Sequence, residues 1–157
     1  MVNWTLENIP ITSQPHILEI GSGNGTLLFA LHEAGYAAPH LTGIDYSPDA
    51  VKLARMVARS QNCEQVAFHV CDFISELLPP PPTPASPALS GQPDADVQES
   101  WDLLVDKGTY DAIALGEKDE SGGCPIAVYP VRASKLLREN GYFLITCKSQ
   151  DNVVVCF

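Results

Sequence analysis

The sequence predicts an α/β fold built on an open, mainly parallel, doubly wound sheet with helices on both faces. Three observations lead to this prediction. Five short apolar runs alternate with amphipathic segments, a glycine cluster follows the first run, and acidic residues follow the next three runs. The chain has 157 residues, 45% of them hydrophobic, which is the size of one domain with a sizeable core.

The first half of the sequence contains two predicted strand–helix units. Their elements are strands over residues 16–20 and 41–45 and helices over residues 26–34 and 47–60. Gly35 is expected to end the first helix, because glycine readily adopts the conformation that follows a helix. Ser47 is the predicted N-cap of the second helix and Pro48 its first residue, so the boundaries of this helix are well defined.

The second half supplies the rest of the sheet and an insertion. Its predicted elements are strands over residues 66–71, 101–106 and 142–147 and a helix that includes residues 133–137. Seven of the thirteen prolines lie within residues 79–93. Proline lacks the N–H that helices and sheets require, so residues 79–100 are predicted to be a disordered insertion in a single domain of residues 1–157. A segment of this kind could also bind an SH3 or WW module.

Charge and cysteine content narrow the classes of function. Nine basic residues stand against nineteen acidic ones, a net charge of −10, which argues against nucleic-acid binding. No apolar run is long enough to span a membrane, and the N-terminus lacks a signal-peptide pattern, so we expect a cytoplasmic protein. Five cysteines and four histidines show no metal-site spacing, so no metal is expected and the thiols are predicted to be reduced.

The strongest local signal is the glycine-rich loop between the first strand and the first helix. Glu19 precedes this loop, which consists of Gly21, Ser22, Gly23, Asn24 and Gly25. Glycines in this position let backbone amides approach a ligand closely. Dinucleotide-binding loops have the spacing GxGxxG, whereas this loop has GxGxG, which disfavours a nicotinamide oxidoreductase.

Acidic residues end the next three predicted strands, at the edge where open α/β sheets bind ligands. Asp45 ends the second strand and can accept hydrogen bonds from the hydroxyls of a ribose; its alternative role is that of a helix N-terminal acid. Asp72 with Phe73 ends the third strand and could bind an adenine, or could be a loop acid beside a core phenylalanine. Asp106 ends the fourth strand, and the reactive end of the ligand is expected there.

Together these features resemble the class I, seven-strand methyltransferases that use S-adenosylmethionine. Residues 105–113 (VDKGTYDAI), with residues 43–48 and 143–146, are most similar to the elongation factor one-alpha lysine methyltransferases. The resemblance covers residues 16–147 apart from the proline-rich insertion. It implies a Rossmann-like fold and S-adenosylmethionine as the cofactor, bound by Glu19, Gly21, Ser22, Gly23, Asn24, Gly25, Asp45, Tyr46, Asp72, Phe73 and Asp106.

The resemblance also implies a reaction and a partner. The substrate is expected to be a lysine of a protein, with elongation factor one-alpha as the named candidate. Asp106 and Tyr110 are the predicted catalytic residues, which position the amine, and proximity is expected to supply most of the rate enhancement. Residues 94–120 carry a charge of −7, which favours capture of a cation but also keeps a lysine protonated.

The sequence departs from the family pattern at both ends. About fifteen residues precede the first strand, and after residue 147 the family motif and the last family strands are expected to be missing. The tail over residues 153–157 either adds one strand or is unrelated to the family. The alternative function is therefore a truncated, catalytically inactive cofactor-binding fragment or an interaction module.

Overall fold

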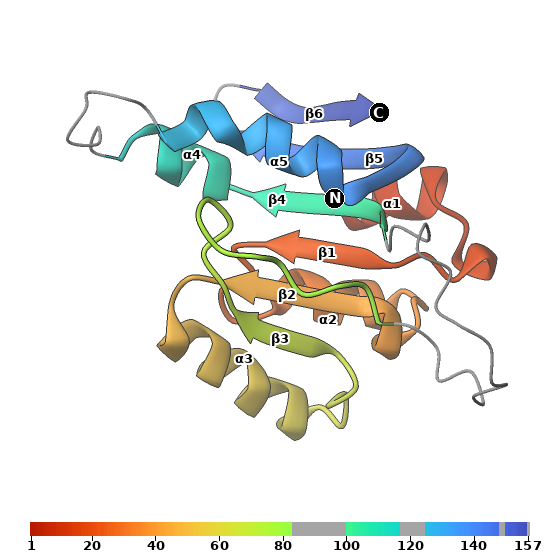
Figure 1. Cartoon of the computed structure of the whole chain (residues 1–157). Coiled ribbons are helices and arrows are strands. Elements are labelled where there is room, and N and C mark those ends of the chain that lie inside the picture. Colours follow the sequence, from red (N-terminus) through yellow and green to blue (C-terminus); the bar gives the residue numbers. More distant parts are fainter. Residues whose placement is uncertain (83–99, 117–124, 148–149, 157) are drawn as a thin grey trace, which may run out of the picture.

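The computed structural model describes residues 1–82, 100–116, 125–147 and 150–156. Its strands are β1 (Ile17–Ile20), β2 (Leu41–Asp45), β3 (Ala67–Val70), β4 (Trp101–Lys107), β5 (Leu137–Cys147) and β6 (Gln150–Cys156). They form one sheet in the order β3-β2-β1-β4-β5-β6 (Figure 1). The first five strands are parallel and β6 is antiparallel to β5, so the predicted α/β fold with a mainly parallel sheet is confirmed.

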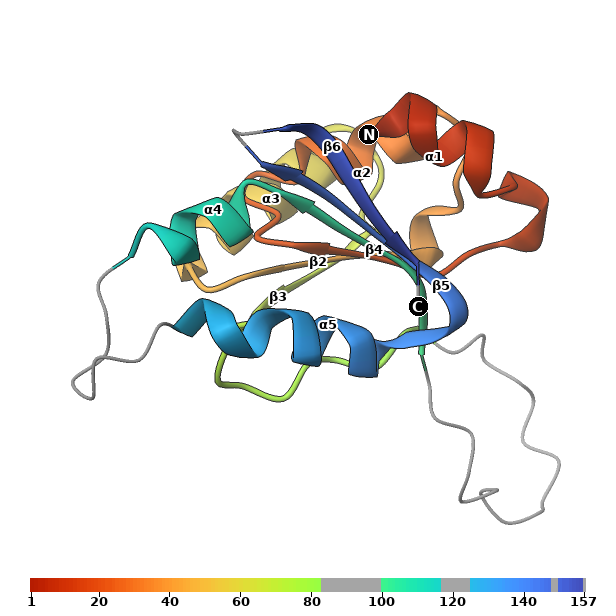
Figure 2. The same cartoon turned by 90° about the horizontal axis from the view of Figure 1, so that it is seen from above.

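Helices cover both faces of this sheet. The described residues form α1 (Val2–Asn8), α2 (Thr26–Glu33), α3 (Pro48–Ser60), α4 (Thr109–Ala114) and α5 (Tyr129–Leu136), with short 3-10 turns at Ile11–Ser13, Ala38–His40 and Pro125–Val128. Figure 2 shows α1, α2 and α3 on one face and α5 on the other. The sheet is therefore doubly wound, as the sequence predicts.

Two apolar cores, one on each face, follow from the alternation of side chains along the central strands. Ile17 of β1 packs with residues of α2 and α3, whereas Leu18 and Ile20 pack with residues of α5. Every residue of β1 and β2 is buried, which is typical of parallel strands covered on both sides. These strands give the loops at their carboxyl ends a fixed base.

Local helix signals are confirmed at two predicted boundaries. Ser47 is the N-cap of α3, and its hydroxyl oxygen accepts a hydrogen bond from the Ala50 N–H at 3.3 Å. Gly35 follows α2 with φ of +111°, a conformation that glycine adopts without strain. Both boundaries are determined by residues close to the helix end in the sequence.

The structure corrects the prediction for the segment before Gly141. The sequence predicts a helix through Leu137 and a strand from residue 142, but α5 ends at Leu136 and β5 already begins at Leu137. Leu137 pairs with Trp101 of β4 and is buried with it in the same core, and the register then shifts before the next pair. Packing against a distant strand thus overrides the local helical pattern.

The apolar pattern does not predict α1 and α4, which have seven and six residues. Such helices are too short to display a hydrophobic period. The tail forms β6 and adds a strand to the sheet, which confirms the first of the two alternatives given for it. Residues 83–99 of the proline-rich insertion lie outside the described residues.

The described residues contain no helix long and apolar enough to cross a membrane. Cys63 and Cys71 are buried free thiols, as predicted for these two cysteines.

Candidate functional site

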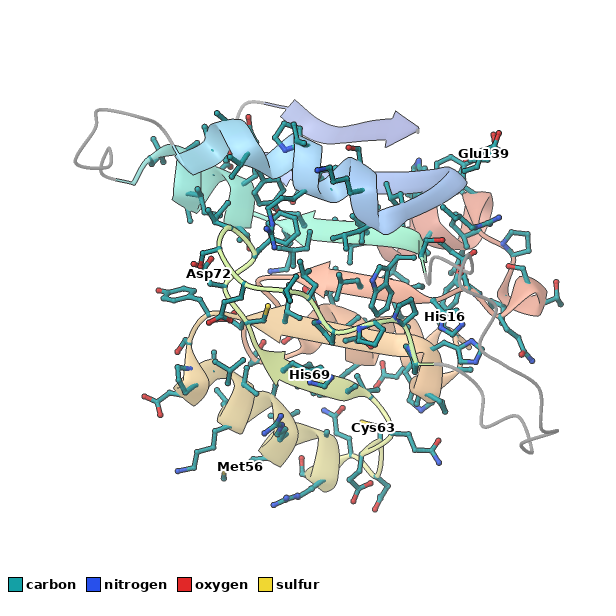
Figure 3. The ribbon with its side chains drawn as sticks, viewed as in Figure 1. His16, Met56, Cys63, His69, Asp72 and Glu139 are labelled. Atoms are coloured by element: carbon teal, nitrogen blue, oxygen red, sulfur yellow. The ribbon has the colours of Figure 1, made fainter. Side chains whose placement is uncertain are left out.

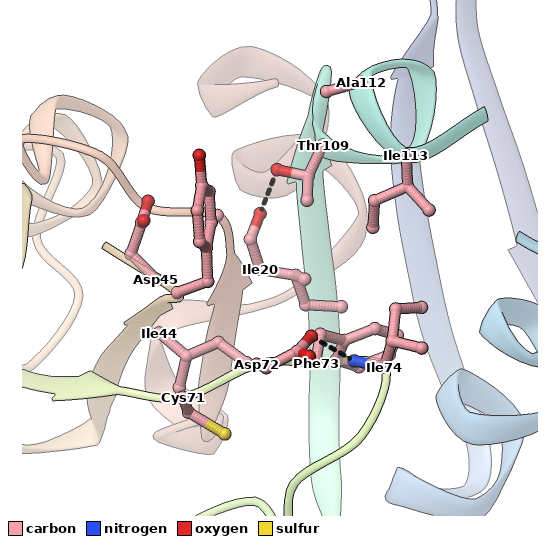
Figure 4. Close-up of a pocket in the computed structure, with 12 residues that line it drawn as sticks. Ile20, Ile44, Asp45, Cys71, Asp72, Phe73, Ile74, Thr109, Ala112 and Ile113 are labelled. Atoms are coloured by element: carbon pink, nitrogen blue, oxygen red, sulfur yellow. Dashed lines mark hydrogen bonds between the residues drawn. The ribbon is translucent and has the colours of Figure 1, made fainter. Parts of the chain in front are cut away.

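The parallel strands end at one edge of the sheet in a cavity of about 460 Å³ (Figure 4). The cavity lies at the carboxyl ends of β1 and β2, between the loop that follows β3 and helix α4. Strands β1 and β4 are neighbours at which the strand order reverses, and open α/β sheets bind ligands at such a switch point. The predicted site residues that line the cavity are Gly21, Asp45, Tyr46, Asp72 and Phe73.

Asp45 fastens the glycine-rich loop to the start of α3. Its Oδ2 accepts a hydrogen bond from the Gly23 N–H at 2.9 Å, and its Oδ1 accepts one from the Ser47 N–H at 2.9 Å. The residue is only 8% exposed, although it lines the cavity. Since a carboxylate can accept about four hydrogen bonds, Asp45 retains acceptor capacity for a ligand.

Gly21 is required where the loop passes α4. Its φ is +68°, and a Cβ at this position would lie 1.8 Å from the Thr109 Oγ1. The Thr109 hydroxyl donates to the Ile20 carbonyl oxygen at 3.0 Å, drawn as a dashed line in Figure 4. Thr109 thus joins the end of β1 to α4 and lines the cavity, a role that the sequence analysis did not assign to it.

Asp72 and Phe73 form the wall after β3. The Asp72 carboxylate accepts hydrogen bonds from the Ile74 N–H at 2.9 Å and the Ser75 hydroxyl at 2.6 Å. Phe73 is buried, and its ring packs on the ring of Tyr129 with centroids 4.4 Å apart. The carboxylate therefore shapes its own loop while an aromatic ring faces the cavity beside it.

The two predicted catalytic residues are linked to each other but are not among the residues lining the described cavity. Asp106 is 0% exposed and accepts hydrogen bonds from the Thr109 N–H at 2.7 Å, the Tyr110 N–H at 2.9 Å and the Tyr129 hydroxyl. Burial raises the pKa of Asp106, and these three hydrogen bonds oppose that rise. The carboxylate stabilises the first turn of α4, so its influence on the cavity is indirect.

Glu19 lies beneath the glycine-rich loop rather than in the cavity. It is 1% exposed, its Oε2 has no hydrogen-bond partner among the described residues, and the Leu28 N–H donates to its carboxyl group. Burial raises the pKa of Glu19 to about 8, and Lys107 opposes this rise. The carboxyl group is therefore largely protonated at neutral pH.

The other predicted loop residues support the shape of the loop. Asn24 Oδ1 accepts a hydrogen bond from the Thr26 hydroxyl at 2.7 Å, and Gly25 is the N-cap of α2, with φ of +80°. Ser22 is buried, and its hydroxyl has no partner among the described residues. Gly23 has open space around the position of a Cβ and donates to Asp45, so it links the loop to the cavity wall.

Histidines and metal ligands play no part in this arrangement. His16 lies at the opposite end of the sheet from Asp72 (Figure 3), and the described part of the chain has no cluster of metal-ligating side chains. The cavity combines apolar walls, carboxylates and an exposed Tyr46 at its rim. Such a site suits a ligand that has a flat apolar ring, hydroxyl donors and a positive charge.

Comparison with known families gives a match over nearly the whole chain. Residues 11–153 match a family described as a methyltransferase domain. Among curated proteins, the chain is 30% identical to protein-lysine N-methyltransferase EFM4 of Saccharomyces cerevisiae over 98% of this chain and 62% of that protein. It is 32% identical to EEF1A lysine methyltransferase 2 of Mus musculus over 93% of this chain and 50% of that protein.

Solved structures agree on the fold. The YcgJ protein of Bacillus subtilis has a TM-score of 0.60 at 17% identity, covering 92% of this chain and 48% of that one. The PH0226 protein of Pyrococcus horikoshii has a TM-score of 0.58 at 17% identity, covering 91% and 52%. In each case the chain spans only about half the length of its structural neighbour.

Proposed function

Since this chain belongs to the family of methyltransferase domains, we propose that it is a protein-lysine N-methyltransferase that uses S-adenosylmethionine. The observation that carries the proposal is the shared cavity. Asp45 after β2 and Asp72 with Phe73 after β3 line one space next to the end of β1. From these positions, one ligand can offer its ribose hydroxyls to the first carboxylate and its adenine to the second pair of residues.

The residues of the cavity fit this cofactor in size and chemistry. A volume of about 460 Å³ lies within the range of small-molecule sites. Ile44, Phe73 and Ile113 offer apolar surface to an adenine ring, and Asp45 has unused acceptor capacity for the ribose. The unpartnered Oε2 of Glu19 lies under the loop that would hold the methionine part.

The chemistry of transfer determines what the protein must do. When bound, the cofactor supplies a methyl group on a positively charged sulfur, which a neutral amine can accept. A free lysine has a pKa of about 10.4, so the site must favour the neutral amine. Carboxylates near the reacting end of the cofactor attract the charged lysine but raise its pKa, whereas burial of the amine against apolar groups lowers its pKa.

Proximity between amine and cofactor is the main contribution that we assign to the protein. In this proposal Tyr110 positions the amine, and Asp106 acts through its hydrogen bonds to α4 because its carboxylate is fully buried. A general base is not required if the lysine enters the site in its neutral form.

The mouse relative is named as a lysine methyltransferase of EEF1A and the yeast relative as a protein-lysine N-methyltransferase, and we propose elongation factor one-alpha as the protein substrate. The proposed place of action is the cytoplasm, where translation factors work. The chain spans 62% and 50% of the length of these relatives. The alternative function is cofactor binding without transfer. The suggested SH3 or WW contact falls largely on residues 83–99, outside the described residues.

Calorimetry with S-adenosylhomocysteine tests the cofactor site. The variant Asp45→Asn loses a charged acceptor, so we expect binding to weaken by about tenfold or more. Asp49→Asn is the matched control, because Asp49 is an exposed acid in the first turn of α3 that does not line the cavity. Equal affinities of the parent and Asp45→Asn would exclude Asp45 from the site, and binding of NAD instead would favour an oxidoreductase.

A transfer assay tests the reaction itself. The chain is incubated with cofactor carrying a labelled methyl group and with purified elongation factor one-alpha, and the label on the factor is measured. Transfer to lysine supports the enzyme, whereas cofactor binding without transfer supports the alternative of an inactive binding fragment.

A further inference from the structure

Tyr129 carries a buried hydroxyl group that is hydrogen-bonded to Asp106, next to the cavity. The residue is 0% exposed, and its hydroxyl donates to the Asp106 Oδ2. The same oxygen accepts the Tyr110 N–H, and the other carboxylate oxygen accepts the Thr109 N–H. One carboxylate therefore connects α5, which contains Tyr129, to the first turn of α4.

The ring of Tyr129 also lies at the centre of an aromatic cluster, defined here as Phe73, Tyr110, Tyr129 and Phe143. Its centroid is 4.4 Å from that of Phe73, 5.5 Å from that of Tyr110 and 6.1 Å from that of Phe143. Phe73 lines the cavity on one side, and α4 lines it on the other through Thr109 and Ile113. Tyr129 thus touches one wall directly and holds the other through Asp106.

We propose that Tyr129 is a positioning residue of the cavity, which sets the separation of the Phe73 wall and the α4 wall by packing on the first and hydrogen-bonding Asp106 behind the second. This inference rests on the proposed function, because the cavity it concerns is the proposed cofactor site. The hydroxyl group, rather than the bulk of the ring, is the feature that the inference depends on.

The pH at which Asp106 becomes protonated provides a second measure of the role of Tyr129. Two acidic residues lie near this carboxylate, the buried Glu19 of β1 and Asp111 of α4. The Tyr129 hydroxyl of α5 donates to the carboxylate, and the Thr146 hydroxyl of β5 donates to the Asp106 backbone carbonyl oxygen. Burial already raises the pKa of Asp106, and the Tyr129 hydroxyl opposes this. Loss of the hydroxyl therefore favours protonation of Asp106 at a higher pH.

The test compares Tyr129→Phe with Tyr36→Phe. Tyr36 is the matched control, because it is 1% exposed and its hydroxyl donates to the Ile9 carbonyl oxygen at 2.7 Å in the core on the other face of the sheet. Both variants keep the ring and lose one buried hydrogen bond. We expect Tyr129→Phe to weaken binding of S-adenosylhomocysteine at least about fivefold, and Tyr36→Phe to change it less than about twofold.

The pH dependence of the same affinity separates positioning from a general loss of stability. In Tyr129→Phe the acid limb of the binding profile is expected to move to higher pH, whereas Tyr36→Phe retains the profile of the parent. Equal affinities and equal profiles for the two variants would overturn the inference. If Tyr129→Phe does not fold, Asp106→Asn is measured in its place. It removes the charged acceptor of the hydroxyl, so binding is expected to weaken and the part of the acid limb that reports Asp106 to disappear, and an unchanged affinity and profile would overturn the inference.

Failure of the proposed function is distinguishable from failure of this inference. If the parent protein does not bind S-adenosylhomocysteine, both are rejected. If the parent binds and the two tyrosine variants behave alike, only the role of Tyr129 is rejected.

Discussion

Glu19 is a carboxyl group that the fold buries almost completely, and its ionisation opposes folding. Burial raises its pKa to about 8, Asp106 and Asp45 add to the rise, and the Leu28 N–H and Lys107 oppose it. A raised pKa means that the folded state binds the proton more tightly than the unfolded state. The resulting stability is full below the ordinary pKa of 4.5 and is lost as the pH rises through about 8.

We predict that Glu19→Gln gains stability relative to the parent as the pH rises from about 5 to about 8, by up to about 1.4 kcal/mol per pH unit. The amide keeps an oxygen for the Leu28 N–H but does not ionise. Urea unfolding at several pH values measures the difference. Glu33→Gln, a change at an exposed position of α2, is the control and should show no such trend. A pH-independent difference for Glu19→Gln would contradict the prediction.

Gly21 and Gly23 allow backbone strain to be separated from side-chain collision. Both have positive φ, +68° and +54°, so an alanine at either position incurs about 1–2 kcal/mol of backbone strain. Only at Gly21 would the new Cβ collide with Thr109, because the space beside Gly23 is open. We predict that Gly21→Ala lowers the free energy of unfolding by about 1–3 kcal/mol more than Gly23→Ala does. Equal losses in urea unfolding would show that the contact with Thr109 is not rigid.

Single residues also show how far sequence reasoning extends into the site. The positions of Asp45 and Asp72 at the cavity follow from the rule that ligands bind beyond the strand ends, which needs only the strand boundaries. The roles of Thr109 and Tyr129 depend on partners 89 and 23 residues away in the chain, Ile20 and Asp106. No local pattern encodes such contacts, so only the folded structure reveals them.

At the scale of elements, α3 is the helix whose start is determined most clearly by local chemistry. Ser47 accepts a hydrogen bond from the Ala50 N–H, and Pro48 and Asp49 occupy the first turn. We predict that Ser47→Ala lowers the free energy of unfolding by about 1 kcal/mol, because one N–H at the helix start loses its acceptor. Ser60→Ala, at the exposed end of the same helix, is the control and should change it by less than about 0.5 kcal/mol. Equal effects in urea unfolding would argue against a capping role.

Elements differ in how much of their definition is local. Helix α3 carries its cap, its first-turn proline and its buried face within its own residues, and the sequence predicts it with nearly correct bounds. Helix α4 begins after Gly108, whose φ is +91°, and its first N–H groups donate to Asp106, a carboxylate buried by other elements. Strand β5 begins early because Leu137 packs with Trp101. Tertiary contacts define these last two elements, so periodicity misses them.

At the scale of the whole molecule, the strand order determines where the site forms. The order reverses between β1 and β4, and the loops that follow β1, β2 and β3 converge with α4 at the same edge of the sheet. The alternation of strands and helices predicts this arrangement, since parallel strands place their carboxyl ends together. The tail, for which the sequence left a strand as one of two alternatives, forms β6 and pairs antiparallel with β5.

A ligand in this cavity touches residues at the ends of β1 and β2, the loop after β3 and helix α4, so its binding should stabilise the fold that holds them together. Any molecule that binds only the folded state stabilises it by RT ln(1 + [L]/Kd), which is about 2.7 kcal/mol at a ligand concentration of about 100 times Kd. In a domain of this size, 1 kcal/mol shifts the melting temperature by about 2–4 °C. We therefore predict that S-adenosylhomocysteine at this concentration raises the melting temperature by about 5–10 °C, whereas NAD leaves it unchanged. Differential scanning calorimetry measures both, and Asp45→Asn at the same ligand concentration should show a smaller rise because its Kd is larger. An equal rise with NAD would indicate that the cavity recognises adenosine alone, and no rise with either ligand would argue against a nucleoside site at this edge.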